Sequence, residues 1–183
     1  MIMERCAKCK KSKNIIHLGY TPYTVCQNCF SDMIERRIKA NIRFFGPLKK
    51  GEKGFLIEND FRPVADFIIK KTFHKEFFSL TNNRDEADVL IDCRSMEEIA
   101  ADFLDKVLKN ESIVSSNIFI FCDIPFDELI QYSRINGIKL ENPKKKELNE
   151  ILNSIQIQFS LIASFKNLIK SINSPSSSHS SPS

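Results

Sequence analysis

Two short cysteine motifs near the start of the chain limit what it can fold into. Each motif is a pair of cysteines separated by two residues, and the four cysteines are Cys6, Cys9, Cys26 and Cys29. Two such pairs, brought together by a short intervening segment, supply the four thiolates of a tetrahedral zinc site. The sequence therefore predicts a zinc ribbon, a small module whose fold is organised by one structural zinc ion.

Two other uses of these cysteines have to be weighed. Four cysteines can also hold an iron–sulfur cluster, and a single pair can act as a thioredoxin-like redox site. Zinc is the simpler interpretation, because neither alternative explains two evenly built cysteine pairs as simply. Between the pairs, the residues from His17 to Tyr23 have the pattern of a strand, a turn and a return strand. His17 itself is expected to pack within the ribbon, because four cysteines already complete the coordination of zinc.

Positive charge is concentrated in the same part of the chain. Residues 1–53 contain 12 Lys or Arg against 4 Asp or Glu, a local excess of +8, whereas the whole chain carries +4. No apolar run approaches the roughly 20 residues that a membrane-spanning helix needs. The N-terminus has cysteine and lysine where a secretory peptide would be apolar. We therefore expect a cytoplasmic protein whose thiols stay reduced.

A basic stripe is predicted on a helix that begins near Cys29. Apolar residues recur there on one face and basic residues on another. Such a basic face suits a phosphate backbone, although a merely solvated helix face is the alternative. Together with lysines of the ribbon, the residues expected to contact nucleic acid are Lys8, Lys10, Lys11, Arg36, Lys39 and Arg43.

After Gly46 and Pro47 the pattern changes to alternating strands and helices. Strands are predicted at 54–57, 77–80, 89–92 and 117–121, and helices at 63–72, 95–110, 126–136, 144–154 and 158–172. This alternation favours an α/β domain with a parallel sheet. The predicted organisation is a zinc ribbon with a basic helix, an α/β domain with C-terminal helices and a disordered Ser/Pro tail, over residues 1–46, 47–173 and 174–183.

The order of these motifs resembles that of the cytoplasmic tRNA 2-thiolation proteins, a branch of the PP-loop ATP pyrophosphatases. The resemblance runs from Cys6 to Ile172 and includes the two cysteine pairs, the basic helix, and the stretch Gly51-Glu52-Lys53 before an apolar strand. It implies a zinc ribbon followed by a PP-loop-ATPase-like domain, related to the adenine nucleotide alpha hydrolases. In the family, that strand leads into a phosphate-binding loop of the pattern SGGxDS.

This chain lacks the phosphate-binding loop. Its place, aligned without gaps from Gly51, is taken by Asn59, Asp60, Phe61, Arg62, Pro63 and Val64. A phosphate cradle needs glycines for close backbone approach and free amides that donate to oxygen. Phe61 is bulky, Pro63 has no amide hydrogen, and the carboxylates of Glu58 and Asp60 would repel pyrophosphate. We therefore expect this degenerate loop to bind no ATP.

Other catalytic features of the family are also missing. The stretch that begins at Cys93 stands where catalytic relatives have a Gly-His-Asn turn, and the segment between Leu80 and Ala87 is shorter than their cysteine-bearing loop. The family's second cysteine-rich zinc site has no counterpart either. Cys93 and Cys122 each follow a predicted strand and could form a catalytic or cluster-binding pair. Two small buried thiols are the interpretation we favour.

The resemblance therefore implies the non-catalytic partner of a heterodimeric tRNA thiolase. A catalytic PP-loop subunit would bind ATP and replace the 2-oxygen of the wobble uridine by sulfur. This chain would not be an enzyme by itself but would contribute tRNA binding and support for its partner, with an exposed apolar patch for that partner on the C-terminal helices. The alternatives are a stand-alone zinc-ribbon regulator that binds nucleic acid, and an enzyme that uses Cys93 and Cys122.

Overall fold

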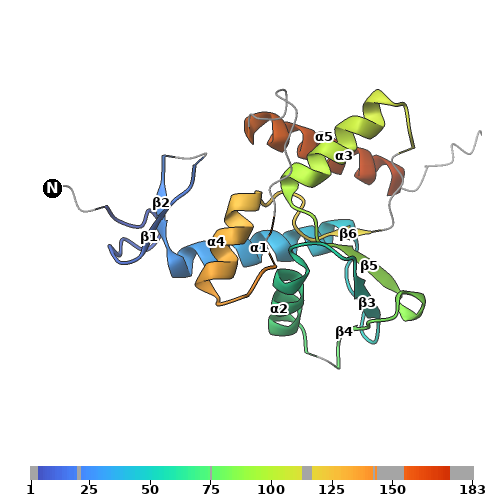
Figure 1. The fold of residues 1–183 in the computed structure, drawn as a ribbon, viewed down its shortest axis with the longest axis horizontal. Helices are drawn as coiled ribbons and strands as arrows, with labels where there is room; N and C mark the ends of the chain where they lie inside the picture. Colours follow the sequence, from blue (N-terminus) through green and yellow to red (C-terminus); the bar gives the residue numbers. More distant parts are fainter. Residues whose placement is uncertain are drawn as a thin grey trace, which may run out of the picture.

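The computed structural model describes residues 4–19, 22–74, 76–112, 117–141, 143 and 155–173. Figure 1 shows a small hairpin at one end of the molecule and a sheet with its helices at the other, connected by the long helix α1. The predicted helix at 144–154 and the predicted disordered tail at 174–183 lie outside the described residues.

The hairpin consists of two three-residue strands that pair antiparallel. Strand β1 (Ile15–His17) lies beside β2 (Thr24–Cys26), with Ile15 opposite Cys26. Helix α1 (Gln27–Phe45) follows β2 without a connecting loop and ends at Gly46. The two cysteine pairs are therefore held by a hairpin and by the first turn of a helix, as the zinc-ribbon prediction requires.

The sheet has four strands, β3 (Lys53–Leu56), β4 (Ser79–Leu80), β5 (Val89–Asp92) and β6 (Ile118–Phe119). Their order is β4-β3-β5-β6, and every neighbouring pair is parallel. The predicted parallel α/β domain is confirmed. Close packing explains why position 54 in β3 is a glycine. A Cβ atom at Gly54 would lie 2.4 Å from the ring of Phe78.

Helices follow three of the four strands. Helix α2 (Arg62–Thr72) follows β3, α3 (Met96–Leu108) follows β5, and α4 (Phe126–Ile135) follows β6. A short 3-10 helix, η1 (Arg84–Glu86), precedes β5, and α5 (Ile155–Asn173) closes the described chain. The apolar run at 117–121 forms a shorter strand than predicted, because the chain turns after Phe119 and the side-chain amide of Asn41 binds the carbonyl of Ile120.

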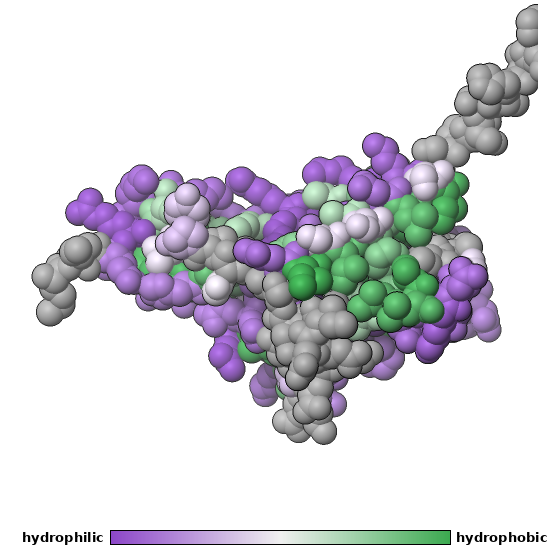
Figure 2. All heavy atoms as spheres, turned by 90° about the horizontal axis from the view of Figure 1, so that it is seen from above, coloured by the Kyte–Doolittle hydropathy of each residue, from purple (hydrophilic) through white to green (hydrophobic). Residues whose placement is uncertain are grey.

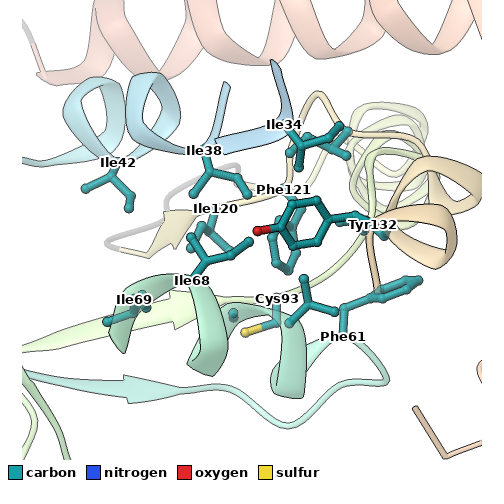
Figure 3. Packing of buried hydrophobic residues seen from close by; sticks show 14 of the residues in the cluster. Ile34, Ile38, Ile42, Phe61, Ile68, Ile69, Cys93, Ile120, Phe121 and Tyr132 are labelled. Carbon is teal, nitrogen blue, oxygen red and sulfur yellow. The ribbon is translucent and has the colours of Figure 1, made fainter. Parts of the chain in front are cut away.

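Buried side chains form two clusters that share helix α1 as a neighbour. The first packs α1 against α2, α4 and the sheet, and Figure 3 shows Ile34 of α1 beside Phe121 and Tyr132, with Ile38 and Ile42 on the side of Ile68 and Ile69 of α2. The second lies beneath α5, where the Phe165 ring is 5.1 Å from Phe119 and 5.5 Å from Phe103. Helix α1 thus belongs to the core of the sheet domain as well as to the ribbon. The domain boundary at residue 46 stays a prediction.

None of the described helices is both long enough and apolar enough to cross a membrane.

Candidate metal centre and the closed loop at the sheet edge

The four predicted cysteines meet in one cluster. The sulfur atoms of Cys6, Cys9, Cys26 and Cys29 all lie within 4.8 Å of one another, and Cys9 Sγ is 3.5 Å from Cys26 Sγ. Cys9 is exposed and the other three are buried. The backbone N–H of Cys9 donates to Cys6 Sγ at 3.4 Å, so the backbone of the first cysteine pair turns back toward the Cys6 sulfur. This cluster could hold a metal ion and fits a zinc ribbon.

The protein environment shifts the pKa values of Cys6 and Cys29 in opposite directions. Burial raises the pKa of Cys6, but hydrogen bonds from backbone N–H groups, first that of Cys9, outweigh it and bring this pKa down to about 6. Burial, together with the neighbouring sulfurs, raises the pKa of Cys29 to about 12. The environment thus favours the thiolate form at Cys6 and the thiol form at Cys29.

The predicted basic residues of the ribbon lie beside this cluster on its solvent side. Lys8, Lys10 and Lys11 are exposed. The Lys8 ammonium is 3.9 Å from Asp32 on α1, and the Lys10 ammonium donates to the carbonyl of Ala7. These contacts are exposed and weak, so the lysines can exchange them for a phosphate.

The predicted basic stripe on α1 faces solvent along its whole length. Arg36, Lys39 and Arg43 are exposed, while Ile34 and Ile38 on the opposite side of the helix are fully buried. Helical spacing explains this division, since residues three and four apart share a face. Within the part of the chain that the structure describes, no carboxylate forms an ion pair with these three basic residues. Their charge is therefore available to an anionic partner.

The degenerate loop is closed by its own side chains. Phe61 lies at the start of α2, is fully buried, and packs edge to face against Phe126 at 5.1 Å and Phe121 at 6.5 Å. The aromatic ring thus belongs to the core. Pro63 and Val64 follow in the first turn of α2, with Pro63 exposed and Val64 buried.

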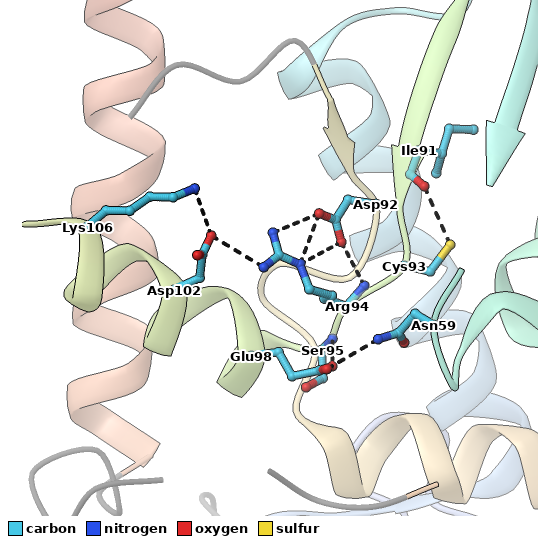
Figure 4. Close-up of polar contacts among 9 residues, drawn as sticks. All are labelled: Asn59, Ile91, Asp92, Cys93, Arg94, Ser95, Glu98, Asp102 and Lys106. Carbon is cyan, nitrogen blue, oxygen red and sulfur yellow. Dashed lines mark hydrogen bonds and ion pairs between the residues drawn. The ribbon is translucent and has the colours of Figure 1, made fainter. Parts of the chain in front are cut away.

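Polar groups of the same loop are also engaged (Figure 4). The Asn59 side chain accepts from the backbone N–H of Phe61 and donates to Glu98 at 3.2 Å. Glu98 in turn accepts the backbone N–H of Ser95 at the start of α3. Next to Asn59, Arg62 pairs with Glu58. One backbone N–H at each of these two helix starts, that of Phe61 and that of Ser95, is therefore already bound by a side chain of the protein itself.

A buried ion pair at the end of β5 is a feature that the sequence analysis missed. Asp92 is buried, and its carboxylate accepts from the Arg94 guanidinium at 2.8 to 3.1 Å. Arg94 also approaches Asp102 on α3 at 3.3 Å. Although burial raises the pKa of Asp102, hydrogen bonding to Lys106 and the charge of Arg94 hold it below its usual value. The carboxylates of Asp92 and Asp102 are thus both paired with basic side chains of this chain.

Cys93 and Cys122 are both fully buried but belong to different clusters of the core. Burial and then the charge of Asp92 raise the pKa of Cys93 far above its usual value. Burial and then Asp123 raise the pKa of Cys122 to about 12. The Cys93 thiol donates to the carbonyl of Ile91 at 3.7 Å. Neither group has the thiolate character that nucleophilic cysteines need near neutral pH.

A second polar network, also missed, joins α1 to the turn after β6 and to α5. The Asn41 amide donates to Asp123 at 2.8 Å, and the Lys166 ammonium binds Asn41 at 2.8 Å and Asp123 at 3.2 Å. Arg37, one turn before Asn41, pairs with Glu128 at 2.6 Å. A sequence signal existed, since Arg37 and Asn41 interrupt the apolar face of α1 with helical spacing.

The comparisons with known proteins bear on the fold. No family model and no curated protein matches the chain. Solved structures do match, among them the U34-tRNA thiolase NcsA from Methanococcus maripaludis with its [4Fe-4S] cluster, at a TM-score of 0.64 and 12% sequence identity. The similarity covers 93% of this chain and 88% of that one. The chain therefore shares the fold of that structure. At 12% identity the likeness concerns the fold alone.

Proposed function

We propose that this chain is the non-catalytic subunit of a heterodimeric complex that thiolates the wobble uridine of tRNA. It would contribute tRNA binding and support a catalytic PP-loop subunit. The fold supports a relation to tRNA thiolation, because a solved U34-tRNA thiolase has a similar structure over most of both chains.

The observation that carries the non-catalytic role is the position of Phe61. Its ring fills the core at the start of α2, where a PP-loop would present glycine amides to phosphate. The arginine of the same loop, Arg62, is already paired with Glu58. A polyphosphate would have to displace buried aromatic surface and break this ion pair, so ATP is expected to bind the partner subunit instead.

Zinc is the metal that we propose for the cysteine cluster. Four Zn–S bonds of about 2.3 Å hold the sulfurs of a tetrahedral site about 3.8 Å apart. The sulfur atoms here lie within 4.8 Å of one another, which suits a single ion. In a [4Fe-4S] cluster, irons and sulfides separate the cysteines further. When bound, zinc would supply cross-links between the hairpin and α1, and no catalytic chemistry.

The exposed basic residues support the tRNA-binding part of the proposal. Arg36, Lys39 and Arg43 form one continuous stripe on α1, which begins at the ribbon. Backbone phosphates of folded RNA are the ligands that such a stripe suits, and each contact releases counterions. The ribbon lysines extend the same basic surface at its N-terminal end.

Co-expression with the PP-loop thiolase of the same organism tests the proposal. The complex is purified by a tag on this chain, sized by chromatography and assayed for thiolation of tRNA, while ATP binding is titrated on each subunit separately. We expect fixed stoichiometry, ATP binding by the partner subunit only, and tRNA thiolation that needs both chains.

Two results would contradict this function. If the chain elutes alone with its metal and binds nucleic acid, the stand-alone ribbon regulator becomes the better account. If the isolated chain binds ATP or thiolates tRNA without a partner, it is an enzyme. A variant with Cys93→Ser and Cys122→Ser would then show whether these thiols take part.

A further inference from the structure

Phe44 is an exposed aromatic residue at the end of the basic stripe. It lies in the last turn of α1, directly after Arg43, and is 41% exposed. Helix α1 begins at the ribbon, where hydrophilic side chains prevail, whereas apolar side chains gather toward the opposite end of the molecule (Figure 2). An exposed ring beside basic side chains is the combination with which proteins bind single-stranded nucleic acid.

The Phe44 ring is held in place by its neighbours in the chain. It meets the Phe45 ring edge to face, with 5.0 Å between the centroids, and the Lys166 ammonium lies 5.6 Å from the Phe44 centroid. Lys166 is fixed in turn by Asn41 and Asp123. A side chain that is already ordered loses little conformational freedom when a flat ligand stacks on it. The ring is thus preorganised for such a contact.

The surroundings of Phe44 favour a nucleotide over a protein surface. Between Arg36 and Phe44 the chain has no carboxylate, and Lys39 and Arg43 are exposed like Arg36. Ala40, one helical turn before Phe44, is also exposed, and its methyl group is too short to cover the ring. Every nucleotide offers both a phosphate and a flat base, so one RNA chain suits the basic side chains and the ring together. A protein surface would need a separate carboxylate for each charge.

We propose that an unpaired base of a bound RNA stacks on Phe44, while phosphates of the neighbouring nucleotides bind Arg43 and Lys39. Such stacking depends on the RNA binding proposed above for the stripe, and it adds a preference for unpaired segments. Bases inside an A-form helix are stacked on one another and cannot reach the ring, whereas bases of loops and bulges can be splayed out. Because every base has a π face, the ring accepts all four bases.

Two RNA probes of equal length, a hairpin with an unpaired loop and a blunt-ended duplex, test this contact on the full chain by fluorescence anisotropy. Phe44→Leu should weaken hairpin binding by roughly tenfold and leave duplex binding unchanged. The slope of log affinity against log salt should stay the same, because no phosphate contact is lost. Phe44→Tyr keeps an aromatic face and should bind like the wild type. Phe77→Leu, at a phenylalanine of similar exposure before β4, is the matched control and should also bind like the wild type.

A fluorescent base in the hairpin loop reports the stacking itself. The adenine analogue 2-aminopurine loses fluorescence when it stacks, and it is placed at each loop position in turn. The wild type should quench it at one position at least, and Phe44→Leu should not. Circular dichroism and the melting temperature establish that each variant is folded.

Three results would overturn the stacking. The first is a loop probe that the wild type quenches at no position, and this result counts even if a variant fails to fold. The second is equal weakening of hairpin and duplex binding by Phe44→Leu, because the ring then acts through the fold of α1. The third is unchanged RNA binding by Phe44→Leu together with loss of the co-purified PP-loop subunit, because the ring then lies in a protein interface.

The same measurements separate this contact from the proposed function. If the wild type binds neither RNA, the tRNA-binding part of the proposed function fails together with the stacking. If the wild type binds both RNAs with a steep dependence on salt and Phe44→Leu changes nothing, only the stacking fails.

Discussion

The guanidinium of Arg37 lies 2.6 Å from the carboxylate of Glu128, although 91 residues separate the two in sequence. Glu128 is 6% exposed, and the Arg37 guanidinium donates a hydrogen bond to its carboxylate. The contact fixes α1, which carries the ribbon and the basic stripe, against α4 in the sheet domain. The ribbon is thereby oriented by a tertiary ion pair with the sheet domain.

Arg37→Ala should destabilise the protein by about 3 kcal/mol, because it leaves the buried Glu128 carboxylate without its guanidinium. Urea unfolding, followed by circular dichroism, measures the change in the free energy of unfolding. Arg36→Ala is the matched control, since Arg36 directly precedes Arg37 on the same helix and is exposed. It should change the free energy of unfolding by no more than about 0.5 kcal/mol. Equal effects of the two substitutions would contradict a role for the ion pair.

Replacement of a metal ligand should unfold the ribbon. Cys6→Ser or Cys29→Ser removes one of four ligands, and small zinc modules derive much of their stability from the metal. We expect zinc content by atomic emission to fall from one ion per chain to nearly none, with loss of the hairpin signals in NMR spectra. Cys93→Ser is the cysteine control and should keep its zinc. Full zinc content and an unchanged melting temperature in Cys6→Ser would contradict the assignment.

Neutralising the basic stripe should weaken RNA binding and its dependence on salt. For the triple variant of Arg36, Lys39 and Arg43 to alanine, each lost phosphate contact should lower the slope of log affinity against log salt by about 0.7 to 0.9. Fluorescence anisotropy with labelled tRNA over a range of salt concentrations gives this slope.

A triple alanine variant of exposed lysines elsewhere, at Lys70, Lys109 and Lys139, removes the same charge and is the control for that experiment. It should change the slope much less than the stripe variant. If both variants lose affinity equally, binding depends on net charge and the stripe is a solvated surface.

Phe61→Ala should cost about 3–5 kcal/mol of stability without creating an ATP site. The ring is fully buried, so its removal leaves a cavity, but the loop still lacks glycines and keeps two acidic side chains. Urea unfolding measures the cost, and titration calorimetry measures ATP binding. Phe77→Ala, at a position 39% exposed, should cost clearly less. ATP binding by the Phe61 variant would mean that the ring alone closes the site.

The two buried thiols should make stability fall at alkaline pH. Burial raises the pKa of Cys122 from 9.0 to about 12, so the unfolded chain loses this proton first. The unfolded state then binds fewer protons than the folded state, and the free energy of unfolding falls as pH rises above about 9. Each thiol contributes a slope of at most about 1.4 kcal/mol per pH unit.

Urea unfolding between pH 8 and 11, with zinc present throughout, measures this decline. The double variant Cys93→Ala and Cys122→Ala should show a shallower decline than the wild type. An identical decline in both proteins would show that other groups, such as lysines and tyrosines, account for it.

Local patterns in the sequence predicted the elements and the cluster of four cysteines. The spacing of Cys6, Cys9, Cys26 and Cys29 and the alternation of strands and helices depend on neighbouring residues alone, because periodicity and turn chemistry act over a few positions. The α/β fold and the exposure of the α1 stripe were predicted for the same reason. The shortened strand β6 was not, because its end depends on the amide of Asn41, 79 residues earlier.

Only the tertiary structure decided how the parts are joined and closed. The pairing of Arg37 with Glu128, the Asn41, Asp123 and Lys166 network, and the burial of Phe61 against Phe126 connect positions far apart in sequence. No local pattern encodes such pairs, because a polar or aromatic residue on a helix acquires its partner only when another element packs beside it. The sequence determined that the phosphate-binding glycines are absent, and the packing of Phe61 determined what occupies their place.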